Sequence, residues 1–259
     1  MTVHFVGAGP GAADLITLRA ATMLTAADVV LYPGTYLDAE VLSHCRDEAK
    51  LVDTQALDLE QMIAVMVDAH LADLDVVRLT SGDPSLYSAL AEQTRRLDSA
   101  GVPWDVTPGV PAYAAAAALV GRELTVPLVA QSVVLTRVQA RSTAMSSTES
   151  LAAFAATRAT LAIHLAIRAM REVMAEVVES YGADCPVIVV FRASQPGEVV
   201  LHGTVADIAD QVEAAGLTQA AVILVGRALA RDSASAGESY LYSADRERRP
   251  KDGDVTFVG

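Results

Sequence analysis

Short apolar segments that end in glycine turns recur along the first 130 residues. Four such segments are predicted strands, at 3–6, 29–31, 76–79 and 104–106. They end in the turns GAGPG, YPG, SGDP and TPG. Apolar residues at helical spacing follow, at 14–24, 59–71, 85–97 and 113–119. This alternation predicts a parallel sheet covered by helices, with a ligand cleft beyond the carboxyl ends of the strands, where small residues let a ligand approach the backbone.

A second block of alternating elements follows the first. Strands are predicted at 132–135, 161–165, 187–191, 199–202 and 221–225, and helices at 149–156, 170–181 and 205–215. Between the blocks, residues 123–130 lack clear periodicity. The pattern therefore predicts an N-terminal α/β domain over 1–126, a C-terminal α/β domain over 127–230 and a polar tail over 231–259.

Charge limits the classes of partner. The 259 residues carry 19 Lys and Arg against 32 Asp and Glu, a net charge of −13. A net acidic surface argues against general binding of nucleic acid or anionic membranes. It does not exclude an anionic small molecule, because a local basic pocket can lie inside an acidic protein. All the cations except Lys50 and Lys251 are Arg. The planar guanidinium of Arg suits carboxylates, but a GC-rich, Ala-rich coding bias is the alternative explanation for this preference.

The chain shows no pattern typical of a metal, disulfide or membrane protein. It has two Cys, and its five His have no ligand spacing, so no metal is predicted. The beginning MTVHFVGAGPG is not that of a signal peptide, and the longest apolar run, 110–121, is too short to span a bilayer. A cytoplasmic protein is therefore expected.

Two of the glycine turns carry residues with possible chemical roles: GAGPG for dinucleotide binding, which is disfavoured, and SGDP through Asp83. GAGPG resembles a dinucleotide-binding loop, but the second predicted strand is followed by Tyr32-Pro33-Gly34 and not by an acidic ribose ligand. Pro10 also lacks the N–H that a pyrophosphate would need. A nicotinamide-dependent oxidoreductase is therefore disfavoured. Asp83 is either an acid, base or hydrogen-bond acceptor, or a residue that organises the SGDP loop. No G-x-S-x-G motif occurs, and no catalytic residue is predicted.

Taken together, five motifs carry a family resemblance. These motifs are GAGPG, YPG, LTSGDPSLYSA, VTPGVPAYAAAAALVG and QSVVLTRVQAR. In this order and spacing the chain resembles the tetrapyrrole methylase family over about residues 1–230. The resemblance implies two α/β domains with a cleft between them, a homodimer, and S-adenosylmethionine bound in the cleft. Because this cofactor has no phosphate, the glycine loop is interpreted as a floor under a flat tetrapyrrole rather than as a phosphate cradle.

The YPGTY and GRELTVP–LTR stretches are similar to the branch that methylates C-11 of precorrin-4 in cobalamin biosynthesis. The resemblance thus implies methyl transfer from S-adenosylmethionine, which leaves S-adenosylhomocysteine and gives precorrin-5. Alternatives are cobalt-precorrin-4 or another corrin position as the substrate, or a non-catalytic tetrapyrrole carrier. The motifs around the cofactor do not separate these alternatives.

The resemblance also assigns residues, by motif position. The expected cofactor-binding residues are Pro10, Ser81, Gly82, Asp83, Leu86, Tyr87, Pro111, Ala112, Leu165, Ala193 and Ala221. For the apolar members, core packing is the alternative role. Those expected on the substrate side are Gly9, Gly11, Tyr32 and Arg137, the last with a surface ion pair as its alternative. Residues 141–148 depart from the proline-rich, acidic pattern of close relatives.

Overall fold

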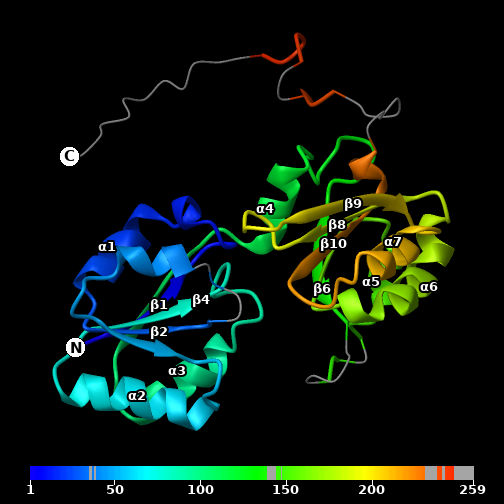
Figure 1. The fold of residues 1–259 in the computed structure, drawn as a ribbon. Helices are drawn as coiled ribbons and strands as arrows, with labels where there is room; N and C mark the ends of the chain where they lie inside the picture. The colour runs from blue at the N-terminus through cyan, green and yellow to red at the C-terminus, as the bar shows by residue number, and fades with distance from the viewer. Residues whose placement is uncertain are drawn as a thin grey trace.

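A computed structural model describes two sheets, each covered by helices (Figure 1). It describes residues 1–34, 37, 39–138, 144–146, 148–230, 238–240 and 243–247. Residues 35 and 36 of the YPGTY motif, residues 139–143 and 147, and most of the predicted tail lie outside the described residues.

The first sheet is parallel throughout, as the alternating pattern predicts. Its strands are β1 (Val3–Gly7), β2 (Val29–Tyr32), β3 (Lys50–Asp53), β4 (Val76–Thr80) and β5 (Trp104–Thr107). Their order is β3-β2-β4-β1-β5, which places β4 and β1 at the centre of the sheet. Their carboxyl ends, and so the GAGPG and SGDP turns, lie side by side.

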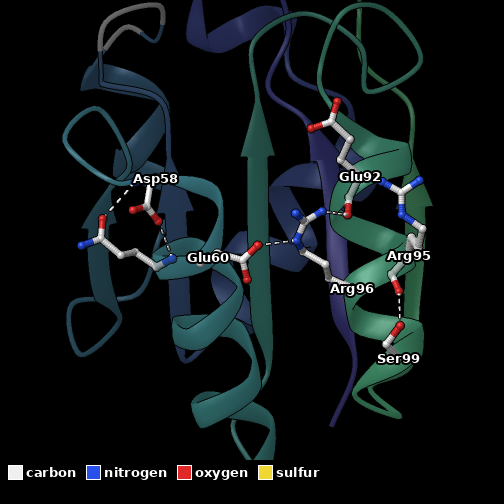
Figure 2. A network of polar contacts seen from close by, with 7 residues as sticks. Asp58, Glu60, Glu92, Arg95, Arg96 and Ser99 are labelled. Atoms are coloured by element: carbon white, nitrogen blue, oxygen red, sulfur yellow. Dashed lines mark hydrogen bonds and ion pairs between the residues drawn. The ribbon is translucent and has the colours of Figure 1, made fainter.

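Helices cover both faces of this sheet. The helix α1 (Leu18–Ala26) buries Leu24 on one face, beside Val30. On the other face, α2 (Leu59–Leu71) and α3 (Leu90–Ser99) bury Met66 and Leu97. Figure 2 shows the polar contacts along these two helices, with Asp58 as the N-cap of α2 and an ion pair from Arg96 to Glu60. A capping box at Asp58 starts the helix where the sequence predicts it.

The second sheet is mixed. Its strands are β6 (Val133–Arg137), β7 (Thr160–His164), β8 (Pro186–Phe191), β9 (Val199–Thr204) and β10 (Ala221–Val225), in the order β6-β7-β10-β8-β9. β6 and β7 are parallel, whereas β10 pairs antiparallel with β7 and β8, and β9 antiparallel with β8. One face is covered by α5 (Leu151–Ala156), α6 (Met170–Tyr181) and α7 (Ile208–Ala214).

The other face of the second sheet is covered by α4 (Ala112–Leu119). Ala116 packs there with Ile188 and Leu224, and Figure 1 shows α4 beside β8 and β9. The helix precedes residue 126, so the core of the second sheet includes residues that the sequence pattern assigns to the N-terminal domain. Short 3₁₀ helices complete the described elements: η1 (Ala13–Leu15), η2 (Ala39–His44), η3 (Ile167–Ala169) and η4 (Arg227–Leu229).

Three elements differ clearly from the sequence-based prediction. The helix expected over 14–24 begins at Leu18, after the separate 3₁₀ helix η1. The strand β3 is not predicted, because its residues Lys50–Asp53 form an exposed edge with little apolar character. The helix expected over 85–97 begins at Leu90 instead. Tyr87 and Ala89 adopt left-handed conformations, at φ 53° and 55°, which interrupt helical geometry before that point.

Candidate functional site

Three glycine turns of the N-terminal part pack directly on one another. A Cβ on Gly7 would lie 2.5 Å from the backbone nitrogen of Gly109 and 2.7 Å from the carbonyl oxygen of Gly82. Gly9 and Gly82 also exchange backbone hydrogen bonds, with N···O distances of 3.2 and 2.7 Å. Glycine at positions 7 and 109 is therefore required by the packing of the turns themselves.

Asp83 connects two of these turns. One carboxylate oxygen accepts hydrogen bonds from the backbone N–H and hydroxyl of Ser85, and the other accepts one from the backbone N–H of Gly109 at 2.9 Å. Burial alone would raise the pKa of Asp83, but these hydrogen bonds together hold it below its usual value. The carboxylate is thus charged at neutral pH and organises the SGDP and TPG loops, one of the two roles that the sequence left open.

The C-terminal part faces these turns with one edge of its sheet. Because β10 runs antiparallel to β7 and β8, the ends of β7 and β8 lie next to the start of β10. The backbone N–H of Arg192, just after β8, donates to the carbonyl of Ala220, just before β10, at 2.8 Å. This edge provides the second wall of the site.

The two parts touch at the GAGPG loop. The side-chain amide of Gln195 donates to the carbonyl of Pro10 at 2.7 Å, and the backbone N–H of Ala12 donates to the hydroxyl of Ser194 at 3.2 Å. A Cβ on Gly11 would collide with the side chain of Gln195. Because Gly11 has no side chain, Gln195 of the other domain can pack directly against its backbone.

Between the two walls lies a cavity of about 430 Å³, within the size range of small-molecule sites. All the expected cofactor-binding residues line it: Pro10, Ser81, Gly82, Asp83, Leu86, Tyr87, Pro111, Ala112, Leu165, Ala193 and Ala221. The residues come from loops far apart in the chain. Their convergence on one cavity is a structural fact, while their contact with a cofactor stays a prediction.

Several strained backbone positions lie in the lining. Tyr87, Leu165 and Arg192 line the cavity and have φ of 53°, 55° and 49°. A left-handed conformation costs a non-glycine residue on the order of 1–3 kcal/mol and persists where the surrounding structure enforces it. Such strain is typical of functional sites.

His164 and Tyr87 meet across the cavity wall. Their ring centroids are 5.4 Å apart, and both residues line the cavity. Burial lowers the pKa of His164 to about 4, so the imidazole is neutral at physiological pH. Its Nε2 is buried and has no hydrogen-bond partner among the described residues.

Comparison with known proteins identifies the family. The model of the tetrapyrrole (corrin/porphyrin) methylases matches residues 2–209. The chain belongs to this family. In addition, the chain is 53% identical over 248 residues to a precorrin-4 C(11)-methyltransferase of Rhodococcus erythropolis, with 96% of this chain and 99% of the relative covered.

Solved structures place the fold of this tetrapyrrole methylase among related enzymes. A cobalt precorrin-4 methyltransferase is 36% identical with a TM-score of 0.85, over 88% of this chain and 96% of the other. A uroporphyrin-III C-methyltransferase of Thermus thermophilus, solved with S-adenosylhomocysteine, is 26% identical with a TM-score of 0.74, over 88% of this chain and 93% of the other. The predicted two-domain α/β fold and family resemblance are confirmed.

The residues expected on the substrate side of this methylase do not line the cavity. Gly9 and Gly11 lie in the GAGPG loop and Tyr32 ends β2. Arg137 ends β6 in register with His164, and its charge lowers the pKa of Tyr87, which burial more strongly raises. Arg137 is therefore near the cavity rim, and substrate binding by these four residues stays a prediction.

Sequence reasoning missed several polar residues of the lining. They are His164, Arg168, Arg192, Gln195, Thr218 and Gln219. His164 directly precedes Leu165, and Arg192 directly precedes Ala193. Their position next to expected cofactor-binding residues could therefore have identified them as lining residues. The loop before β10, which supplies Thr218 and Gln219, carries no motif.

Two further findings concern the described residues of this methylase. No group of three or more His, Cys, Asp or Glu side chains within them could hold a metal ion. Within the same ranges, every helix is too short or too polar to cross a membrane.

Proposed function

We propose that this methylase transfers the methyl group of S-adenosylmethionine to C-11 of precorrin-4, in cobalamin biosynthesis. The observation that carries the proposal is the convergence of the eleven expected cofactor residues on one cavity. A relative named for this activity is 53% identical over nearly its whole length, which supports the choice of reaction.

The residues of the cavity fit such a cofactor. Its lining combines apolar side chains, such as Leu86 and Pro111, with polar groups from both domains. The only described carboxylate in the lining, Asp83, is charged, whereas the neighbouring imidazole of His164 is neutral. A cationic sulfonium is thus not repelled by the N-terminal wall, where Asp83 lies, whereas Arg168 and Arg192 place positive charge on the C-terminal wall. The cavity volume of about 430 Å³ also suits a nucleoside-sized ligand.

When bound, S-adenosylmethionine supplies an electrophilic methyl group on a sulfonium. In the reaction, the carbon–sulfur bond breaks with its electron pair going to sulfur, and a pair on C-11 forms the new carbon–carbon bond. One proton then leaves the substrate to restore its charge. The protein contributes alignment of the reactants at about 3–3.5 Å, which the rigid, mutually packed turns around Gly7, Gly82 and Gly109 favour.

The metal-free substrate is favoured over its cobalt form. Identity is 53% with the precorrin-4 enzyme of Rhodococcus erythropolis and 36% with the solved cobalt precorrin-4 methyltransferase. Purified protein should therefore convert precorrin-4, in the presence of S-adenosylmethionine, to a product one methyl group heavier. Mass spectrometry and NMR of the product test the reaction and its position. Tetrapyrrole binding without methylation would instead support the carrier, and methylation elsewhere would support another corrin position.

Arg137 is the proposed contact for a substrate carboxylate. A net charge of −13 repels a polyanion unless local cations compensate. We expect Arg137→Ala to raise the substrate KM by roughly tenfold to a hundredfold, the value of a charged hydrogen bond. Arg137→Lys should restore part of the loss, because it keeps the charge without the planar fork. Equal losses for tetrapyrrole and S-adenosylhomocysteine in titrations would point to misfolding, and no loss would return Arg137 to a surface ion pair.

We also propose a homodimer, on the family resemblance. Sedimentation at micromolar concentration should give twice the mass of one chain, and a monomer would contradict the proposal.

A further inference from the structure

Two arginines line the C-terminal wall of the cavity and are held by the same short segment. The Nε of Arg168 donates to the carbonyl of Thr218 at 2.8 Å. Arg192 donates its backbone N–H to the carbonyl of Ala220 at 2.8 Å. Arg168 lies in η3, just after β7, and Arg192 follows β8. Arg168, through its guanidinium, and Arg192, through its backbone, therefore both lie against the segment that precedes β10.

The hydrogen bonds of these side chains leave their terminal nitrogens available. Arg168 uses Nε for Thr218, and Arg192 uses Nε for the side-chain oxygen of Gln195 at 3.2 Å. Within the described ranges, neither guanidinium pairs with a carboxylate. Arg171, by contrast, is only three residues beyond Arg168 and pairs with both Asp210 and Glu213. Arg168 lines both the cavity and a groove that it shares with Arg171, and among the described residues it differs from Arg171 in having no carboxylate partner.

The charges around the cavity point to an anion. Asp83, the one carboxylate among the described lining residues, lies on the N-terminal wall and is already engaged with Ser85 and Gly109. The C-terminal wall carries two positive charges in a protein whose net charge is −13. Planar guanidinium groups with free terminal N–H donors match a carboxylate in geometry as well as charge.

We infer that Arg168 and Arg192 form a carboxylate-binding subsite on the C-terminal wall of the cavity. This inference rests on the proposed function, which brings two sources of carboxylate to the cavity. One is the amino-acid end of the cofactor, and the other is a side chain of the tetrapyrrole. The subsite recognises the chemistry common to both, and it is separate from Arg137 at the end of β6.

Calorimetric titration with three probes tests the subsite and distinguishes the sources. S-adenosylhomocysteine carries the amino-acid carboxylate, and 5′-methylthioadenosine has the same adenosine thioether without it. Uroporphyrin III provides a stable polycarboxylated tetrapyrrole. The variants are Arg168→Gln and Arg192→Gln, with Arg95→Gln as the control. Arg95 is an exposed residue of α3 that does not line the cavity, and its substitution changes the net charge equally.

Each cavity variant is expected to lose roughly tenfold to a hundredfold in affinity for one carboxylate-bearing probe. Loss for S-adenosylhomocysteine, with 5′-methylthioadenosine unchanged, assigns the subsite to the cofactor. Loss for uroporphyrin III with both nucleosides unchanged assigns it to the substrate. Three outcomes would overturn the subsite. The affinities for all probes could stay unchanged, both nucleosides could lose affinity equally, or Arg95→Gln could show the same losses.

The proposed function is tested apart from the subsite by the wild-type protein. A wild type that binds no S-adenosylhomocysteine and methylates no precorrin-4 would contradict the proposed function. The uroporphyrin titrations of the two cavity variants would still decide whether the wall binds carboxylates.

Discussion

The imidazole of His164 lies at the end of β7, against the ring of Tyr87, with its Nε2 buried and unpaired among the described residues. A buried polar atom without a partner costs about 1–3 kcal/mol. Protonation of this ring would add a charge in the same surroundings, which is why burial lowers its pKa to about 4. The site therefore holds a neutral ring whose charging destabilises the fold.

We expect this histidine to make stability depend on pH. Its pKa is about 4 in the folded protein and near 6.5 when unfolded, so between these values the unfolded chain binds more protons. The free energy of unfolding should fall as pH decreases from 6.5 to 4, by at most about 3 kcal/mol from this residue. His164→Phe keeps a ring against Tyr87 and should flatten that part of the curve.

Urea unfolding across this pH range measures the effect. The control is His202→Gln, which removes an exposed histidine on β9 and should leave the curve unchanged. If the free energy of unfolding of His164→Phe depends on pH as steeply as that of the wild type, groups other than His164 cause the dependence.

At the scale of elements, the loop between β4 and α3 depends on a buried polar network. Gln93, 1% exposed in α3, donates to the carbonyls of Ser88 and Ala89 at 3.2 Å each. Its side-chain oxygen accepts from Nε of Arg78, also at 3.2 Å. Burial lowers the pKa of Arg78 to about 10, so it stays charged at neutral pH. The network holds the strained loop that carries Leu86 and Tyr87 into the cavity.

We predict that Gln93→Met destabilises the protein and weakens cofactor binding. Methionine has a similar shape but provides neither the donor nor a strong acceptor, so Nε of Arg78 and two loop carbonyls lose partners. The expected cost is about 2–3 kcal/mol in unfolding. Affinity for S-adenosylhomocysteine, measured where the variant is fully folded, should fall as well. Glu92→Met, an exposed neighbour on α3, is the control, and equal effects in both variants would contradict the network's role.

The elements also show which features could be predicted from the sequence. The parallel strands of the first sheet were predictable because buried apolar runs and glycine turns are local signals. The edge strand β3 was not, because Lys50–Asp53 gains its strand geometry from pairing with β2. The motifs picked out the expected cofactor-binding residues, which converge on one cavity, and their contact with a cofactor stays a prediction. Arg168 and Gln195 carry no motif, and their places in the wall depend on contacts between distant segments.

At the scale of the whole molecule, the two domains are joined through the GAGPG loop. Gln195 and Ser194 of the C-terminal part hydrogen-bond Pro10 and Ala12 of the N-terminal part. Pro10 and Gln195 both line the cavity. The contact that joins the domains is thus also part of the wall, so its geometry sets the distance between the two halves of the site.

The last prediction concerns this contact. Gly11→Ala should weaken binding of S-adenosylhomocysteine, because the new methyl group collides with Gln195 and must push the domains apart or displace that side chain. The backbone at Gly11 also has φ +154°, which alanine rarely adopts. Gly101→Ala controls for backbone strain, since Gly101 has φ +71° but open space around it.

Adding Gln195→Ala to Gly11→Ala should recover part of the affinity, since it removes the collision while the strain remains. Calorimetry of the single and double variants measures the coupling. Purely additive losses would show that position 11 acts through its own backbone and not through the contact between the domains.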